Sequence, residues 1–288
     1  MSGRRRWKFS DGLLLSMLVA LAIGAAWHVW ASIMTVGIED EEQSHVLIAP
    51  LVVVWLAWLR RDRFRFVGPR WSWAGPAVAL AGIGLMWFGE RNLFEVFEQL
   101  GAIFLLVGAI LSIIGVRLAA HLYPSFGAMI FLLHVPGMFR QDIALPLQNA
   151  SAQITEWTLG MLQFPIERAG NQLLINGVEV GIAEACNGMR MVSALALVSY
   201  AFVFSVPMRN WVRVLILAAS PLVALAVNVL RLAPTTLMYG YTEADTAKLF
   251  HDVSGWAALL VALAVLWAFL ALLRWLEVPI APIKVARA

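Results

Sequence analysis

The sequence changes character at Glu184-Ala185-Cys186-Asn187-Gly188-Met189-Arg190, where a polar segment gives way to a long apolar stretch. This heptapeptide holds the only cysteine of the 288 residues. A thiol at the start of a helix, with an arginine one turn later, lies where positive charge favours the thiolate. The pattern indicates a nucleophile. The alternative interpretation is that a lone cysteine is a small buried apolar residue.

Composition places the chain in a membrane. Hydrophobic residues make up 61% of the sequence and charged residues 14%, against roughly 45–50% and 25% in soluble domains. The basic residues are scattered in short clusters between apolar runs, which excludes a nucleic-acid-binding surface. A single cysteine cannot form a disulfide within the chain. Without an HExxH motif or a second cysteine, we expect no metal site and no cofactor.

The apolar runs predict an all-α polytopic membrane protein that forms a single domain over residues 1–288. Its first run is longer than the apolar core of a signal peptide and is expected to be retained. Since one long run contains Pro221 and Pro234, we expect a kink or an end near Pro234. About eight transmembrane helices are predicted, at residues 12–34, 46–59, 73–88, 94–116, 118–135, 189–206, 211–239 and 253–276.

Residues 136–185 are too polar to span. Within them, apolar side chains recur at spacings of three and four between Leu147 and Met161, which predicts an amphipathic helix on the membrane surface. Two short strands around Asn176-Gly177 then predict a β-hairpin that leads directly to Cys186.

Lysine and arginine counts orient the chain with both termini in the cytoplasm. With eight spans, most of the 21 basic residues fall in cytoplasmic segments, above all in residues 4–8 and 60–70. The segment 136–185 and Cys186 then lie on the outer, periplasmic face. The outer segments hold only four basic residues: Arg91, Arg140, Arg168 and Lys248.

Arg231 and His251 are the other candidates for chemistry. Arg231 lies in an almost wholly apolar stretch, where an arginine is functional or paired unless it reaches the interface. Asn228, on the same helical face, could hold its guanidinium in place. His251 is predicted in the outer loop before the last helix, and His45 also lies on the outer side. For any one of these histidines alone, a satisfied interfacial side chain is the simpler interpretation.

The topology brings Cys186, Arg231 and His251 to the same surface from three different spans. A cysteine beside a histidine can attack a carbonyl, because the histidine removes the thiol proton and later protonates the leaving amine. An arginine supplies fixed positive charge for the thiolate or the developing oxyanion. Arg190 either stabilises the thiolate or anchors the helix end, and Glu184 either supports the site or only pairs with an arginine.

These residues resemble the motifs of the exosortase/archaeosortase family of membrane cysteine transpeptidases. Residues 184–190 resemble its ACSGxR motif, Asn228-Val229-Leu230-Arg231 its NxxR motif, and His251-Asp252-Val253-Ser254-Gly255-Trp256 its histidine before a Gly-Trp helix start. Ser44-His45 resembles its N-terminal SHG-type segment. Asn187 stands where the family most often has serine, and Val46 where it usually has glycine.

The resemblance implies a function in protein sorting. Such an enzyme recognises exported proteins by a C-terminal signal of the PEP-CTERM type, which comprises a short motif, a transmembrane helix and a basic tail. Cys186 would cleave near the motif and form a thioester, His251 would act as acid and base, and Arg231 would stabilise charge. The product passes to an acceptor nucleophile. Members of the family lie in the lipid bilayer of the bacterial inner membrane, and they often accompany exopolysaccharide synthesis.

Two other classes of function remain as alternatives. A secondary transporter would use Arg231 to bind an anionic solute, although the sequence has neither an inverted repeat nor paired broken helices. The second alternative is a non-catalytic assembly factor for envelope polysaccharide or sorted proteins. Either alternative would tolerate Cys186→Ala.

Overall fold

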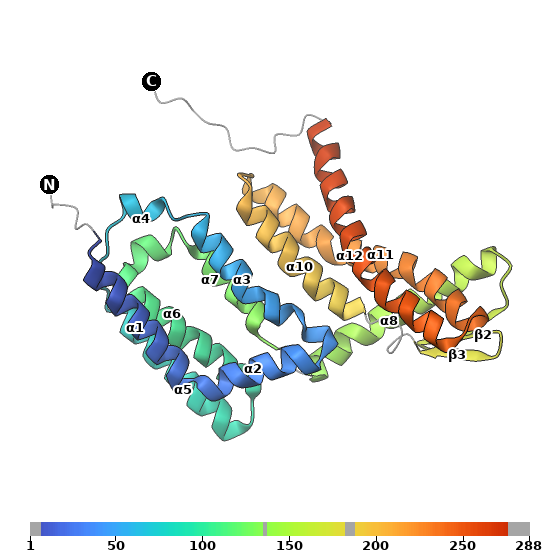
Figure 1. Ribbon diagram of the computed structural model, residues 1–288, viewed down its shortest axis with the longest axis horizontal. Coiled ribbons are helices and arrows are strands. Elements are labelled where there is room, and N and C mark those ends of the chain that lie inside the picture. Colours follow the sequence, from blue (N-terminus) through green and yellow to red (C-terminus); the bar gives the residue numbers. More distant parts are fainter. Residues whose placement is uncertain (1–6, 135–136, 182–187, 276–288) are drawn as a thin grey trace. The chain divides into compact units, whose positions relative to one another are not determined.

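The computed structural model describes residues 7–134, 137–181 and 188–275, which are mostly helical with one small sheet (Figure 1). The chain divides into two compact units, each described here by itself: Met1–Pro136 and Gly137–Ala288. The helices of unit 1 are α1 (Phe9–Ala25), α2 (Trp27–Glu39), η1 (Glu41–Gln43), α3 (His45–Trp58), α4 (Arg63–Phe66), α5 (Ala74–Asn92), α6 (Glu95–Ala119), α7 (Tyr123–Ala128) and η2 (Met129–Leu132). The elements of unit 2 are α8 (Gly137–Met161), β1 (Ile166–Ala169), β2 (Gln172–Ile175), β3 (Val178–Gly181), α10 (Gly188–Ser205), α11 (Asn210–Tyr241) and α12 (Ala244–Trp275).

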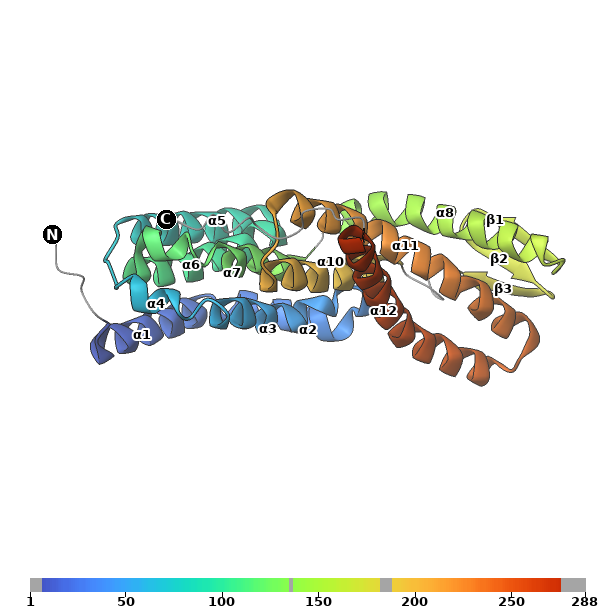
Figure 2. The same cartoon turned by 90° about the horizontal axis from the view of Figure 1, so that it is seen from above.

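Glycines bring α5 and α6 into close contact, and the two helices lie side by side in both ribbon views (Figures 1 and 2). A Cβ atom at Gly82 would lie 2.6 Å from the backbone oxygen of Gly101 and 2.6 Å from the backbone nitrogen of Leu105. Small residues allow such approach, which is typical of helix pairs in membranes. The buried glycines recur every seven residues in each helix: Gly75, Gly82 and Gly89 in α5, and Gly101 and Gly108 in α6.

Three helices of the described chain are long and apolar enough to cross a membrane: α6, α11 and residues 244–273 of α12. The predicted span 12–34 is broken at Ala26, where the backbone leaves the helical region (φ −109°, ψ 25°). It forms α1 and α2, which meet at 73° and would add a fourth span if they count as one. Eight spans are therefore not confirmed. The 14 residues of α3 extend about 21 Å, less than the roughly 30 Å of a hydrocarbon core.

The predicted span 118–135 is wrong. Its first residues end α6, where Gly115 already departs from helical geometry (φ 71°, ψ 162°). The chain then begins a new short helix, α7, with Pro124 in its first turn, and continues as η2 only to Leu132. Proline suits a helix start because its missing N–H would have no partner there. Apolar composition alone did not distinguish this short pair of helices from a span.

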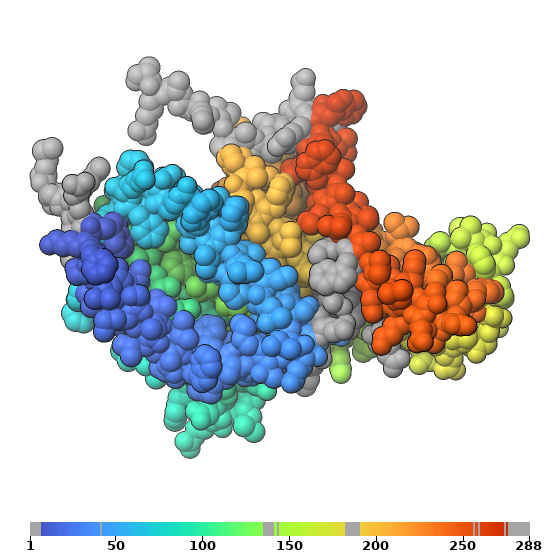
Figure 3. All heavy atoms as spheres, viewed as in Figure 1, coloured from blue at the N-terminus to red at the C-terminus, as the bar shows by residue number. Residues whose placement is uncertain are grey.

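The long helices expose apolar side chains. Leu222 and Leu230 of α11, and Leu260 and Trp267 of α12, are each 69% exposed. In Figure 3, α12 lies at the visible surface of unit 2. Such exposure is unfavourable in water, at about 25 cal/mol per Å² of apolar surface, but lipid tails are themselves apolar. This surface and the candidate spans identify a multi-pass membrane protein.

The helix does not end near Pro234, because α11 continues from Asn210 to Tyr241; a kink at Pro234 stays a prediction. Pro221 removes the N–H that would bond to the carbonyl of Leu217. The hydroxyl of Ser220 donates to that carbonyl instead, at 3.0 Å. Just after Pro234, the hydroxyl of Thr235 donates to the Arg231 carbonyl at 2.8 Å. The carbonyl that Pro234 frees is that of Leu230, not the Arg231 carbonyl to which Thr235 donates. The Ser220 hydroxyl thus re-satisfies a freed backbone group, as serine and threonine do within membrane helices.

The predicted two-stranded hairpin is part of a three-stranded antiparallel sheet in the order β1-β2-β3. The turn at Asn176-Gly177 joins β2 and β3 as expected, with positive φ at both residues (51° and 76°). The side chain of Asn176 donates to the carbonyl of Gly240 at 2.9 Å, which fastens the sheet to the end of α11. Ile175 is fully buried there, and a Cβ atom on Gly240 would lie 2.7 Å from its Cγ2.

Candidate active site

Cys186 and Glu184 fall in residues 182–187, outside the described residues. The structure describes the chain on both sides of them. β3 ends at Gly181, and α10 begins at Gly188, two residues after the cysteine. Arg190 lies in the first turn of α10. In the sequence, the predicted nucleophile thus falls between the end of β3 and the start of α10.

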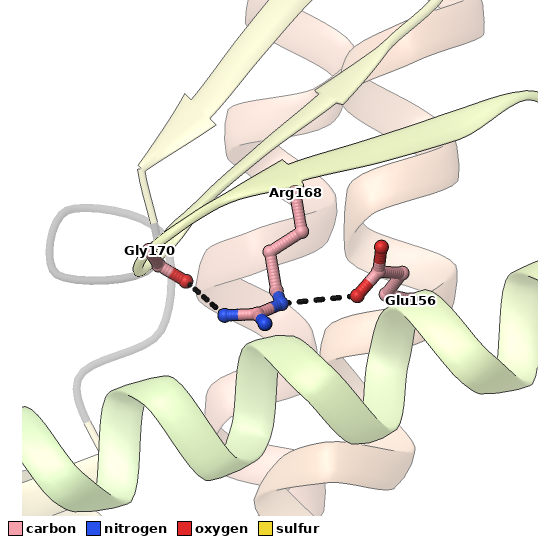
Figure 4. A network of polar contacts seen from close by, with 3 residues as sticks. All are labelled: Glu156, Arg168 and Gly170. Atoms are coloured by element: carbon pink, nitrogen blue, oxygen red, sulfur yellow. Dashed lines mark hydrogen bonds and ion pairs between the residues drawn. The ribbon is translucent and has the colours of Figure 1, made fainter.

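The sheet that leads to this link is attached to α8. Arg168 of β1 donates from Nε to the Glu156 carboxylate at 3.0 Å and from Nη1 to the Gly170 carbonyl at 2.9 Å (Figure 4). Asn171, in the turn between β1 and β2, donates to the side-chain oxygen of Gln148 in α8 at 3.2 Å. These bonds hold the β1–β2 turn and α8 in a fixed register.

α8 buries polar side chains together with the apolar Ala152 and Leu159, and it exposes several large apolar side chains. Gln148, Ser151 and Thr155 are buried, whereas Trp157 is 65% and Met161 82% exposed. α8 packs against α11 and the sheet. A helix whose apolar side faces outward suits a membrane surface. Its buried side packs against the sheet and α11 through Ala152 and Leu159.

α10 packs against α11, the helix that holds Asn228 and Arg231. The two helices pack together, and only residues 206–209 join them, so they run in opposite directions. Met191 of α10, Val227 of α11 and Ala258 of α12 belong to one buried apolar cluster. The three elements that carry or adjoin the predicted site residues therefore form one packed group.

Arg231 reaches from α11 to α12. A Cβ atom on Gly255 would lie 3.1 Å from Arg231 Nη1, so the guanidinium lies against the backbone of α12 at this glycine. His251 is one helical turn before Gly255 on the same helix. The structure thus brings the regions of Arg231 and His251 together, although they are twenty residues apart in the sequence.

His251 lies inside α12, not in the loop where the sequence predicted it, because α12 already begins at Ala244. Its Nδ1 atom is 3.0 Å from Oδ1 of Asp252. The side chain of His251 is 18% exposed and that of Asp252 is 60% exposed. Sequence reasoning did not select Asp252. Its position directly after a candidate catalytic histidine was the available signal.

Asn228 does not hold the guanidinium of Arg231 by a hydrogen bond. The side chain of Asn228 is 1% exposed, and neither atom of its amide has a hydrogen-bond partner among the described residues. A buried amide without a partner is costly. This group is therefore available to a polar atom that the described chain does not supply.

His45 belongs to unit 1, whereas Arg231 and His251 belong to unit 2. It begins α3 and is buried, as is His134 beyond the end of η2. The backbone N–H of His134 donates to the side-chain oxygen of Gln99 at 2.8 Å. Burial lowers the pKa of both histidines. A hydrogen bond with the Glu42 backbone partly offsets this lowering of the pKa of His45. The negative charges of Glu95 and Asp40 partly offset the lowering of the pKa of His134.

Within the described ranges, no three histidine, cysteine, aspartate or glutamate side chains gather as a metal site requires. The groups near Arg231 instead offer a cation, an imidazole and a free amide. An imidazole can transfer a proton, and a guanidinium and an amide N–H can stabilise a negatively charged oxygen. This combination supports acyl-transfer chemistry, provided that a nucleophile stands nearby.

Comparison with known proteins gives one result. The sequence matches the family model described as transmembrane exosortase (Exosortase_EpsH) over residues 27–268. No curated protein and no solved structure matches the chain. The matched region includes Cys186, Arg231 and His251 and covers most of both units. The chain therefore belongs to the transmembrane exosortase family.

Proposed function

We propose that this protein is a cysteine peptidase or transpeptidase that cleaves a C-terminal sorting signal from exported proteins. The observation that carries the proposal is the approach of Arg231 to Gly255, one turn from His251. These residues lie on two helices that pack with α10, and α10 begins two residues after Cys186. Membership of the exosortase family supports the same function.

The proposed reaction has two steps. The Cys186 sulfur attacks the scissile carbonyl carbon as His251 takes the thiol proton, and Arg231 stabilises the oxyanion. The C–N bond then breaks, His251 returns the proton to the leaving amine, and a thioester remains on Cys186. In the second step a water, amine or hydroxyl acceptor attacks the thioester carbonyl. The acceptor's proton passes to His251, and the thiol is released.

The proposed substrates carry a short motif, a transmembrane helix and a basic tail at their C-terminus. The exposed apolar side chains of α11 and α12 support this choice, because a substrate helix in the same bilayer can pack against them. We place the protein in the bacterial inner membrane with both termini in the cytoplasm and the site facing the periplasm. The lysine and arginine distribution supports this orientation.

A cleavage assay tests the proposal. The full-length protein, as wild type or Cys186→Ala, is co-expressed with an exported reporter that carries a PEP-CTERM-type tail from the same genome. We expect wild type to shorten the reporter and Cys186→Ala, at equal membrane abundance, to leave it full length. Hydroxylamine should release a thioester-linked reporter fragment from wild type. Equal processing by both variants would overturn the assignment of Cys186.

A second assay needs no substrate. Because Cys186 is the only cysteine, the rate of alkylation of the whole protein by iodoacetamide reports this one thiol. If Arg231 lies near Cys186, Arg231→Gln should slow alkylation at neutral pH, since thiolate is the reactive form. Arg168→Gln removes an arginine from the same unit that is held by Glu156 and Gly170, and it should leave the rate unchanged. Equal rates for all three proteins would remove Arg231 from the site.

A further inference from the structure

The hydrogen bond between His251 and Asp252 identifies which nitrogen of the imidazole carries the proton. The two atoms are His251 Nδ1 and Asp252 Oδ1, 3.0 Å apart. A carboxylate only accepts hydrogen bonds. The hydrogen in this bond therefore belongs to Nδ1.

This assignment determines the chemistry of the ring. A neutral imidazole has one N–H and one lone pair. With the hydrogen on Nδ1, the lone pair is on Nε2, across the ring from Asp252. A histidine acts as a base only through the nitrogen that holds the lone pair. Nε2 is thus the basic atom of His251.

The side chains of His251 and Asp252 differ in their exposed fractions. Asp252 is 60% exposed and His251 only 18%, so the carboxylate lies at the surface while most of the ring is covered. The Ser254 hydroxyl donates to the His251 carbonyl at 3.0 Å and so does not compete for the ring. Of the ring nitrogens, Nδ1 is held by Asp252, and Nε2 is left for another partner.

We propose that Asp252 is a positioning residue that fixes the Nδ1–H tautomer of His251 and thereby makes Nε2 the atom that exchanges protons in the reaction. Its contribution to rate rests on the proposed function. The tautomer itself rests only on the hydrogen bond. The same arrangement, a carboxylate on one imidazole nitrogen and a reacting group on the other, orients histidine in catalytic triads.

The tautomer is measured by ¹⁵N NMR of the full-length protein in lipid bilayers, with ¹⁵N-labelled histidine at a pH of about 8.5, above the ordinary histidine pKa. The chain has five histidines, and the spectrum of His251→Gln identifies the signals of His251. We expect the wild-type ring to be in the Nδ1–H form. Asp252→Asn should lower that fraction, because a carboxamide can also donate to Nδ1, and Asp252→Glu should keep it. An Nε2–H ring in wild type, or no change in Asp252→Asn, would overturn the proposal.

The reporter assay measures the consequence for rate. We expect Asp252→Asn to slow processing by about tenfold or more, but less than the roughly 10⁴-fold loss when the buried aspartate of a catalytic triad becomes asparagine, because Asp252 is 60% exposed. Asp252→Glu should restore most of the rate. Asp245→Asn removes another exposed carboxylate from the first turn of α12 and should have no effect. An unchanged rate in Asp252→Asn would refute its role in proton exchange. Processing by Cys186→Ala would instead refute the proposed function, and the NMR result would still decide the tautomer.

Discussion

Replacing Gly82 by alanine should separate α5 from α6, whereas the same change two residues later should not. A Cβ atom at Gly82 would lie 2.6 Å from two backbone atoms of α6, and one at Gly84 would meet nothing within 4 Å. Carbon contacts are most favourable at about 3.5–4.0 Å. The helices must therefore move apart by about 1 Å, because backbone atoms of a helix cannot shift individually.

Overpacking of this kind costs about 1–3 kcal/mol. Alanine returns up to about 1 kcal/mol through its higher helix propensity. We therefore expect Gly82→Ala to destabilise unit 1 by about 1–2 kcal/mol. Gly84→Ala gains the same propensity without a clash and should be neutral or slightly stabilising. The two variants should differ by about 2 kcal/mol.

The assay is unfolding of the purified protein in mixed micelles with increasing denaturing detergent, followed by far-UV circular dichroism. Wild type, Gly82→Ala and Gly84→Ala are compared at equal lipid and detergent content. A Gly82→Ala protein as stable as Gly84→Ala would refute the close approach of α5 and α6. Destabilisation by both would show that loss of glycine itself, and not the contact, is responsible.

Gly255→Ala should lower reporter processing several-fold without loss of protein, because the new Cβ atom would lie 3.1 Å from Arg231 Nη1 and displace it by a few tenths of an ångström. The matched control is Gly160→Ala in α8, whose new Cβ atom would meet nothing within 4 Å. Equal processing rates in the two variants would contradict the contact between Gly255 and Arg231. Stability should fall as the pH drops below about 6.5, because His45 and His134 have lowered pKa values when folded and the unfolded chain takes up more protons. Each histidine contributes at most about 1.4 kcal/mol per pH unit. His45→Gln or His134→Gln should flatten the dependence of unfolding on pH between about 5 and 7; an unchanged slope would show that these rings do not remain neutral in the folded protein.

The sequence was enough to indicate the family, but not the surroundings of the predicted site residues. The order and spacing of Cys186, Arg231 and His251 were sufficient to indicate the family, and residues 27–268 match its model. The approach of Arg231 to Gly255 depends on how α11 and α12 pack, which no spacing along one helix encodes. Asp252 was overlooked because a residue beside a histidine interacts with it only in some side-chain conformations.

Local chemistry by itself determined two features of the fold. The high apolar content required a membrane environment, since no soluble core could bury so much apolar surface. The dipeptide Asn176-Gly177 determined the β2–β3 turn, because few other residues accept positive φ at both positions. Each of these two features depends on composition or on adjacent residues, so neither requires a contact with another segment of the chain.

Only the tertiary structure decided how the apolar runs are divided and joined. The chain breaks at Ala26 and begins a new short helix at Tyr123, yet it continues through both prolines of α11. Ser220 shows why composition could not predict this continuity. A proline breaks a helix when the carbonyl it frees stays unbonded, and here the Ser220 hydroxyl bonds to that carbonyl. Whether the helix continues past a proline therefore depends on whether another group bonds to the freed carbonyl, not on the proline alone.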